Sequence, residues 1–300
     1  MTAAVLEPRA ITARYRDETI AQVEQIKATG REVRVVGLLG QTEGPAAVYA
    51  KYARKGFEAA GITLDVWQVT PDEVEQAIAR ANHDDTVDGI FLYYPFRDPA
   101  ADRWLRELVD PRKDVEGMHS FWARLLWENQ RFVDPTHQWP AILPCTPLAI
   151  LKLLQHAVSP TGEKPLRGLT ACVINRSDIV GKPLAAMLAN DGVRVHSLDA
   201  DGAVVFEPAE AGHTHFVADS DYTREQALAE ADLVVSAVPV AAFDPIEAHE
   251  LRDGAICVNV SERANFADSV MERASVFVPR VGQLTVTLAA RNAARLAAQH

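Results

Sequence analysis

The stretch GLTACVINRSDIVGKPLAAMLANDGVRVHSLD, residues 168–199, decides the fold class. It opens with an apolar run typical of a buried strand and closes with a second such run at residues 193–199. Between them, a polar turn leads into a helix that we expect to begin at Pro183 and to stop at Asp191 and Gly192. Strand, helix and strand in this order predict an α/β unit with parallel strands.

Towards the C-terminus the alternation continues. Residues 200–221, which we interpret as a long irregular segment, precede a helix and three further apolar runs at residues 231–239, 253–260 and 274–279. With the first two runs, they predict five strands in one sheet of a size that suits a cofactor. The last stretch, residues 285–299, is rich in Ala, Leu and Arg with helical spacing and predicts a terminal helix.

Towards the N-terminus a second alternation appears. Apolar runs at residues 32–40 and 88–95 and an alternating stretch at 63–69 predict strands, and helices are expected over residues 46–60 and 72–82. The order again predicts a parallel sheet with both faces covered. The best linker candidate between the two halves is Ser159-Pro160-Thr161-Gly162. The predicted fold class is therefore a two-domain α/β protein.

Length and composition bound the function. A chain of 300 residues favours two domains, and 48% hydrophobic with 24% charged residues is typical of a folded globular protein. The formal net charge is −11 and no basic run occurs, which argues against nucleic acid or an anionic membrane as the main partner.

Cysteine usage and the N-terminus suggest a compartment. The chain has 3 cysteines, widely spaced and without a CxxC pair, so neither a disulfide framework nor a zinc site is indicated. No signal-like N-terminus and no long apolar segment is visible, which predicts a cytoplasmic protein. His196, His213 and His215 could suggest a metal, but the H-x-H pair lies in an acidic, loop-like stretch without cysteine partners and is interpreted as surface; no metal is assigned.

The turn after residue 174 predicts a dinucleotide site. A strand that leads directly into a helix presents backbone N–H groups and the positive end of the helix dipole to a pyrophosphate. Asn175 stands where a G-x-G-x-x-G motif has its first glycine, and only Gly181 remains. Asp199 ends the next strand, where an acidic side chain accepts the ribose hydroxyls of NAD and repels the extra phosphate of NADP. The alternative is a plain loop with a solvated aspartate. The candidate cofactor-binding residues are Asn175, Arg176, Ser177, Ile179, Val180, Gly181, Asp199, Val238, Pro239 and Asn259.

Three motifs carry a family resemblance. KDVEGMH at residues 113–119, PCTPLAILKLL at 144–154 and NRSDIVGKPLAAML at 175–188, in this order, resemble the methylenetetrahydrofolate dehydrogenase/cyclohydrolase family. The resemblance runs from about residue 35 to residue 295. It implies a folate-binding catalytic domain over residues 1–158, a Rossmann-type NAD-binding domain over 159–282, a last helix over 283–300 that packs back on the first domain, and a homodimer.

The chain departs from the bifunctional members at three places. Those members carry a Tyr-x-x-x-Lys on the first helix, a Gln in the third strand and an Asp in a D-V-D-G turn. Tyr49 keeps the tyrosine place, whereas Ala53, Tyr93 and Glu116 replace the lysine, the glutamine and the aspartate. The neighbouring lysines lie two residues from Ala53, about 200° around the helix, and cannot replace the missing one. These departures resemble the monofunctional NAD-dependent branch of the family.

The resemblance also implies roles for the substrate site. Glu116 would hydrogen bond the pterin end of the folate, and Tyr49 and Tyr93 would contact its ring; for Tyr93, a packing role in the space of the old glutamine is an open alternative. Cys145 is expected to shape the substrate wall, because no histidine is placed to activate it as a nucleophile. The wall candidates are Pro144, Cys145, Thr146 and Pro147.

The chemistry then predicts an activity. Hydride transfer from 5,10-methylenetetrahydrofolate to NAD requires orientation and no strong base. Hydrolysis of the methenyl product requires a tunable acid/base such as a lysine, and Ala53 cannot supply one. We therefore expect an NAD-dependent dehydrogenase without cyclohydrolase activity. Two alternatives are a bifunctional enzyme that uses another base such as Glu116, and a non-catalytic NAD- or folate-binding paralogue.

Overall fold

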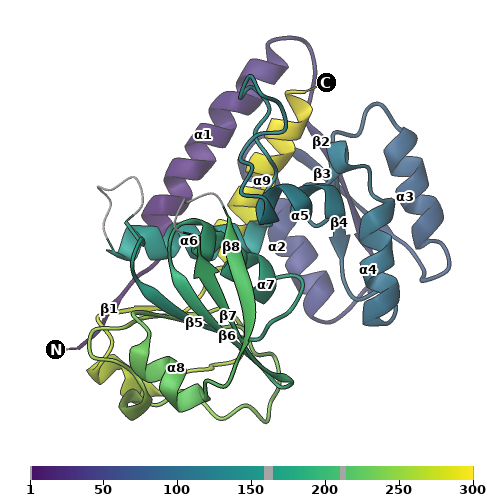
Figure 1. The fold of residues 1–300 in the computed structure, drawn as a ribbon. Helices are drawn as coiled ribbons and strands as arrows, with labels where there is room; N and C mark the ends of the chain where they lie inside the picture. The colour runs from purple at the N-terminus through teal and green to yellow at the C-terminus, as the bar shows by residue number, and fades with distance from the viewer. Residues whose placement is uncertain (1, 159–164, 210–213, 300) are drawn as a thin grey trace. The chain divides into compact units, whose positions relative to one another are not determined.

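The computed structural model describes residues 2–158, 165–209 and 214–299 (Figure 1). The chain forms two compact units. The three-strand unit comprises Thr12–Leu125, Arg131–Cys145 and Thr285–His300, and the eight-strand unit comprises Met1–Ile11, Leu126–Gln130 and Thr146–Leu284. The linker predicted at residues 159–162 lies outside the described residues, so the domain boundary placed there stays a prediction.

The three-strand unit is built on a parallel sheet, as predicted. Its strands are β2 (Arg34–Leu39), β3 (Thr63–Gln68) and β4 (Gly89–Tyr93), in the order β3-β2-β4. Alternate residues of β2 face opposite sides, as a pleated strand requires. One set joins the core beside α2 (Pro45–Ala59), and the other joins the core beside α3 (Val74–His83) and α4 (Pro99–Leu108). Helices therefore cover both faces (Figure 1).

The last helix, α9 (Gly282–Ala297), packs on this N-terminal sheet, as the resemblance implied. Gly56 permits the close approach of α2 and α9, because a Cβ at this position would collide with Val286 Cγ1. At the other end of α9, Arg31 donates a hydrogen bond to Ala297 O at 3.1 Å and pairs with the buried Asp88 at 2.7 Å. The terminal residues thus complete the core of the first half.

Several helices were not among the predicted elements. The longest is α1 (Arg9–Lys27), whose sequence is mostly polar. Its buried positions nevertheless recur every three or four residues along one face, the spacing of an amphipathic helix. They are Ile11, Tyr15, Thr19, Val23 and Ile26. Among the others are α4, η1 (Pro111–Lys113) and α5 (Ser120–Trp127). The helix α6 (Cys145–Val158) continues from the PCTP motif, where a helix is expected.

The eight-strand unit contains the five predicted parallel strands. They are β5 (Thr170–Ile174), β6 (Arg194–Asp199), β9 (Leu233–Ser236), β10 (Ile256–Asn259) and β11 (Val276–Val278). Among the described residues the sheet has eight strands in the order β1-β11-β10-β9-β5-β6-β7-β8, with β1 (Ala4–Val5) parallel to β11. From β5 the chain first adds β6 on one side of β5 and later returns to add β9 on the other side, so the strand order reverses at β5. Open α/β sheets bind ligands at such a switch point.

The interpretation of residues 200–221 as irregular is wrong. This segment forms two antiparallel strands, β7 (Gly202–Pro208) and β8 (His215–Ser220), that extend the sheet beyond β6. The strand β8 is an edge strand and is mostly exposed, so it lacks the continuous apolar run by which the buried parallel strands were predicted. Residues 210–213 lie outside the described part of the chain.

Helices flank this sheet as well. The helix α7 (Gly181–Asn190) begins two residues before the predicted start, since a proline is tolerated in the first turn of a helix. The helix α8 (Arg224–Glu230) starts with a capping box between Thr223 and Gln226. Short 3₁₀ helices η2 (Ala248–Glu250) and η3 (Asp268–Glu272) complete the unit. Among the described residues, no helix combines the length and the apolar character needed to cross a bilayer.

Candidate active site

The KDVEG turn is anchored by its lysine. Lys113 is buried, and its Nζ donates hydrogen bonds to the carbonyl oxygens of Ala81 at 3.1 Å, Asn82 at 2.8 Å and Asp84 at 2.8 Å. These carbonyls lie at the C-terminal end of α3, where a helix leaves acceptors unpaired. Burial lowers the pKa of Lys113. With its three donors engaged, this lysine fixes the turn.

The carboxylate of Asp114 organises the rest of the turn. Asp114 is buried and accepts four backbone N–H groups, from Glu116 and Gly117 at 3.0 Å each, from Met118 at 2.7 Å and from His119 at 2.8 Å. Burial raises the pKa of Asp114, and these hydrogen bonds oppose the rise. Gly117 has φ +68°, and a Cβ there would lie 2.9 Å from Leu143 C, so the turn lies tightly against the segment before the PCTP motif.

Glu116 is half-buried and points back to the sheet. Its Oε2 accepts a hydrogen bond from Leu92 N in β4 at 3.1 Å. Burial, with the negative charge of Asp114 added to it, raises the pKa of Glu116 to about 8. At neutral pH the side chain therefore keeps its proton and both donates and accepts hydrogen bonds.

Tyr49 and Tyr93 lie together in an aromatic cluster. The ring of Tyr49 on α2 is 6.1 Å from that of Tyr93 and 6.2 Å from that of Phe91, and Phe91 stacks on Tyr93 at 4.8 Å along β4. Tyr93 is 2% exposed, and among the described residues its buried hydroxyl has no hydrogen-bond partner. Burial is the main cause that raises the pKa of both tyrosines, and Glu116 adds to it in each. The structure thus brings Tyr49, Tyr93 and Glu116 to one place.

Room for Tyr93 comes from the neighbouring strand. A Cβ at Gly37 in β2 would lie 2.7 Å from Tyr93 Cε2, so only glycine leaves the ring its present position. The ring of Tyr93 therefore packs as part of the core, while its hydroxyl has no hydrogen-bond partner among the described residues.

Ala53 lies on the same face of α2 as Tyr49 and Phe57. It is 0% exposed, and its neighbours in the core are apolar side chains and the aromatic cluster. Lys51 and Lys55, in contrast, are exposed, as the helical geometry predicts. The place that the family resemblance assigns to a lysine is occupied here by a methyl group in an apolar environment.

Cys145 is held as a thiol. Its Sγ donates to Val115 O at 3.3 Å, and Asn292 of α9 donates through Nδ2 to Val115 O at 3.0 Å, to Leu143 O at 3.1 Å and to Cys145 Sγ at 3.4 Å. Burial, with Glu116 nearby, raises the pKa of Cys145 well above its usual value, which leaves no thiolate nucleophile. The other wall candidates, Pro144 and Pro147, are buried, and Thr146 is half-buried.

Sequence reasoning missed Asn292. A sequence signal for it was present, because Asn292 is an amide with Leu288, Ala289 and Leu296 one turn away on the helix, and the structure buries it. A buried polar group on such a face needs hydrogen-bond partners, and here they are backbone carbonyls of the turn and of the PCTP motif.

In the eight-strand unit, Asn175 shapes the turn after β5. Its φ is +86°, the left-handed region that asparagine adopts more readily than most non-glycine residues. Its side chain donates to Ala237 O at 2.9 Å and accepts from Ser177 N at 3.0 Å. Asn175 therefore performs the work of the missing glycine and also links the ends of β5 and β9 at the switch point.

Gly181 closes the same turn. A Cβ on Gly181 would collide with the carbonyl oxygen of Asn175, so the start of α7 approaches the turn as only glycine allows. Ser177 Oγ accepts from Val180 N at 3.3 Å and from Gly181 N at 3.5 Å. Val180 is half-buried, and Ile179 is 38% exposed at the surface. The structure thus provides a helix N-terminus directly after the strand at the switch point.

Asp199 is exposed at the carboxyl end of β6. Its Oδ2 accepts from Arg176 N and its Oδ1 from Ala200 N, both at 2.7 Å. Each oxygen keeps a second lone pair, so the carboxylate is oriented and still able to accept from a ligand. The guanidinium of Arg176, by contrast, is engaged with Asp201.

Asn259 and Val238 belong to a network that supports the ends of β9 and β10. Asn259 is 8% exposed, and its Oδ1 accepts from Asn265 N at 2.9 Å. Asn265 in turn accepts from Val238 N at 2.9 Å and donates to Val238 O at 3.0 Å. Asn265 was not predicted, because an isolated asparagine in a loop gives no sequence signal. Pro239, next to this network, is exposed.

Of the three histidines singled out in the sequence, the structure describes His196 and His215. His196 is buried with its ring stacked on Tyr222 at 4.2 Å, and the Nδ1 of His215 lies 2.9 Å from Asn190 Oδ1. His213 lies outside the described residues. Across the described ranges, no group of three or more His, Cys, Asp or Glu side chains is arranged to hold a metal ion.

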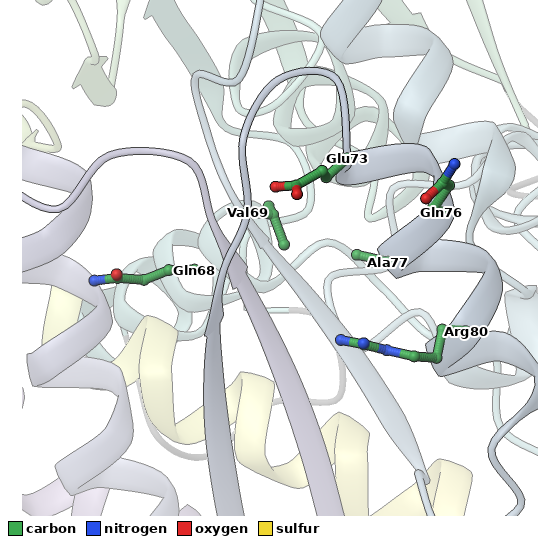
Figure 2. A pocket seen from close by; sticks show the side chains of 6 residues that line it. All are labelled: Gln68, Val69, Glu73, Gln76, Ala77 and Arg80. Atoms are coloured by element: carbon green, nitrogen blue, oxygen red, sulfur yellow. The ribbon is translucent and has the colours of Figure 1, made fainter.

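A surface pocket of about 390 Å³ lies elsewhere on the three-strand unit, at the end of β3 and along α3 (Figure 2). It contains none of the predicted site residues. Its lining is Gln68, Val69, Glu73, Gln76, Ala77 and Arg80. Glu73 is bound to the backbone and the hydroxyl of Thr70 at 3.1 and 2.7 Å, so it closes a local turn.

One unit has a mostly parallel sheet with a strand-to-helix turn at its switch point, and the other has a fully parallel sheet. Together they define a two-domain α/β protein with a Rossmann-type domain. The chain belongs to the tetrahydrofolate dehydrogenase/cyclohydrolase family. The model of the family's catalytic domain matches residues 6–116, and that of its NAD(P)-binding domain matches residues 144–300.

Similar proteins agree with this assignment. The chain is 37% identical to methylenetetrahydrofolate dehydrogenase [NAD(+)] of Saccharomyces cerevisiae, with 94% of this chain and 92% of the yeast protein covered. It is 27% identical to the bifunctional protein FolD of Staphylococcus haemolyticus, with 97% of this chain and 96% of the FolD protein covered. The solved structure of the NAD-dependent 5,10-methylenetetrahydrofolate dehydrogenase from S. cerevisiae superposes with a TM-score of 0.90 at 34% identity, covering 99% of this chain and 97% of that one.

The raised pKa of Glu116 predicts a pH-dependent stability. The pKa of Glu116 is about 8 in the folded chain against an ordinary 4.5. The contribution of the protonated carboxyl to the free energy of unfolding is therefore fully present below pH 4.5 and is lost as the pH rises through about 8. Glu116→Gln should remove this loss. Relative to the variant, the wild type should become less stable by at most about 1.4 kcal/mol per pH unit across the window.

Urea unfolding at several pH values between about 5 and 8 measures the difference. Glu43→Gln, at an exposed site outside the cluster, is the control and should follow the wild-type pH dependence. Parallel curves for Glu116→Gln and the wild type would contradict the assignment.

Proposed function

We propose that this chain oxidises 5,10-methylenetetrahydrofolate to 5,10-methenyltetrahydrofolate with NAD as the hydride acceptor, and that it releases the methenyl product without hydrolysing it. The observation that carries the second part is Ala53, a fully buried methyl group at the place of the family's lysine. The names of its NAD(+)-dependent relatives support the first part. A homodimer in the cytoplasm stays a prediction from the sequence.

The eight-strand unit fits the cofactor. The turn from Asn175 to Gly181 would hold the pyrophosphate with the backbone amides that lead into α7, and Asp199 would accept the hydroxyls of the adenosine ribose. When bound there, NAD supplies the acceptor for the hydride.

Glu116 would hold the substrate. The edge of a pterin ring carries adjacent N–H groups and acceptors, and a protonated carboxyl matches such an edge with one donor and one acceptor. The hydrogen bond from Leu92 N fixes the carboxyl in place. The hydroxyl of Tyr93 would find its partner on the same ligand, and the ring of Tyr49 would pack beside it.

Apart from Glu116, the described residues of this cluster offer no ready base for hydrolysis. Attack of water on the methenyl carbon requires a group that accepts a proton near neutral pH. Tyr49, Tyr93 and Cys145 have pKa values raised by burial, so each stays protonated, and the amine of Lys113 is engaged by three carbonyls. The hydride step needs no such group, because the folate nitrogens stabilise the cation that forms.

A second candidate function retains cyclohydrolase activity through Glu116. The supporting observation is its pKa of about 8, which makes it the group of this cluster that titrates nearest to neutral pH. Its hydrogen bond to Leu92 N holds it as a ligand for the pterin, which favours the first proposal.

The direct test uses purified protein with 5,10-methylenetetrahydrofolate and either NAD or NADP. With NAD, methenyltetrahydrofolate should accumulate, and its ultraviolet absorbance measures the amount formed. Its subsequent hydrolysis should be no faster than in a control without the enzyme. A clear preference for NADP would sink the cofactor assignment, and enzyme-accelerated decay would establish the bifunctional alternative. Binding of NAD without any turnover would indicate the non-catalytic paralogue.

Restoring the family's lysine tests why hydrolysis is absent. Because Tyr93 fills the place of the glutamine, the informative variant is Ala53→Lys combined with Tyr93→Gln. Its matched control is Ala53→Met with Tyr93→Gln, which adds similar length without an amine. A positioned acid/base contributes about 10² to 10⁴ in rate, so we expect methenyl hydrolysis to be at least about tenfold faster in the lysine variant than in the control. Equal rates in two folded variants would show that the lysine is not what this site lacks.

Asp199→Ser tests the choice of cofactor. Removing the carboxylate removes both the acceptor for the ribose hydroxyls and the repulsion of a 2′-phosphate. We expect kcat/KM for NADP relative to NAD to rise at least about tenfold, or about 1.4 kcal/mol. Asp219→Ser, at an exposed position of β8, should leave the ratio unchanged. An unaltered ratio in Asp199→Ser would mean that Asp199 does not face the ribose.

A further inference from the structure

The hairpin that replaces the expected irregular segment places a second carboxylate beside Asp199. Strands β6 and β7 pair with Asp199 opposite Gly202, so that Ala200 and Asp201 form a two-residue loop. Gly202 has φ +120°, which its lack of a side chain permits. The tight loop fixes the position of Asp201 relative to the end of β6.

Asp201 holds the side chain of Arg176. The guanidinium donates through Nη2 to Asp201 Oδ1 at 2.6 Å and through Nη1 to Ser197 O at 3.2 Å and Gly202 O at 3.1 Å. The side chain of Arg176 is only 13% exposed, whereas that of Asp201 is 80% exposed. Arg176 thus lies against the hairpin, with Asp201 on its solvent side.

The same arginine starts next to the candidate ribose site. Its backbone N–H donates to Asp199 Oδ2 at 2.7 Å, so its side chain begins beside the carboxylate that would meet the ribose. In dinucleotide sites an arginine at such a place accommodates the 2′-phosphate of NADP, since a guanidinium binds phosphate through two parallel hydrogen bonds. Here those donors point to the hairpin, and their charge is balanced by Asp201.

We propose that Asp201 is a positioning residue for cofactor selectivity: by holding Arg176 against the β6–β7 hairpin, it denies a 2′-phosphorylated dinucleotide the cation that would bind its phosphate. This inference rests on the proposed function, because it requires Asp199 to face the adenosine ribose of NAD. In this arrangement Asp199 repels the extra phosphate directly, and Asp201 removes the arginine that would compensate.

The test compares Asp201→Asn with a matched control elsewhere in the same unit. Asp253 pairs with Arg273 at 2.5 Å and is 87% exposed, but it lies before β10, at the amino end of the strand. An exposed ion pair is worth little, so Asp201→Asn should raise kcat/KM for NADP relative to NAD by about fivefold. Asp253→Asn should leave this ratio at the wild-type value. The double variant Asp199→Ser with Asp201→Asn should have a higher ratio of kcat/KM for NADP to kcat/KM for NAD than Asp199→Ser alone.

The dependence on Arg176 separates positioning from a simple loss of charge. In Asp201→Asn combined with Arg176→Gln, the gain for NADP should disappear, because no guanidinium is left to release. Binding of 2′,5′-ADP relative to 5′-AMP, followed by calorimetry, should show the same order without any folate turnover. A gain that persists without Arg176, or no gain in Asp201→Asn while the wild type turns over NAD, would overturn the inference alone. A wild type that neither binds NAD nor turns it over would overturn the proposed function and the inference with it.

Discussion

The buried carboxylate of Asp114 is the constraint on which the candidate active site depends. Four backbone N–H groups converge on it and close the turn, and the closed turn brings Glu116 to Leu92 in β4. Asn292 then ties the same turn to the PCTP segment and to the last helix. The position of Glu116 follows from these contacts, and so does its protonation, because the charge of Asp114 adds to the effect of burial. The surroundings of Glu116 thus keep its carboxyl protonated, so that it can both donate and accept a hydrogen bond.

The sequence predicted what depends on local pattern. Most of the parallel strands are buried on both faces and appear as continuous apolar runs, while β3 is partly exposed and alternates; all eight predicted strands are found in the two sheets. Strand β8 has an exposed face and an unpaired edge, and its alternation was too weak to distinguish from a loop. The mostly polar helix α1 was missed for a similar reason, since only a narrow stripe of it is buried.

The sequence motifs predicted which residues belong to the candidate site but not how their side chains are oriented. Tyr49, Tyr93 and Glu116 come together in the structure, and the direction of the Arg176 side chain does not follow from its place in the turn. That direction is set by a hairpin whose existence was not predicted. Asn265 escaped prediction because its partner is a backbone atom 27 residues away in sequence. Asn292 stands out as an amide in the last helix, but its backbone partners, 177 and 149 residues away, do not follow from spacing in one chain.

Ala53 and Tyr93, at the places where the family resemblance implies a lysine and a glutamine, belong to one buried cluster. A lysine at residue 53 would place its amine among apolar side chains and beside the ring of Tyr93, where an unpaired charge is costly. A polar neighbour such as the family's glutamine would lower that cost, and a tyrosine in its place gives one hydroxyl on a ring fixed by Gly37 and Phe91. Once the amine is absent, the apolar cluster gains from a larger ring, because burial of aromatic surface stabilises the core. A small apolar residue at position 53 and a large ring at position 93 therefore suit one another, and under the proposed function such a cluster orients a folate without activating water.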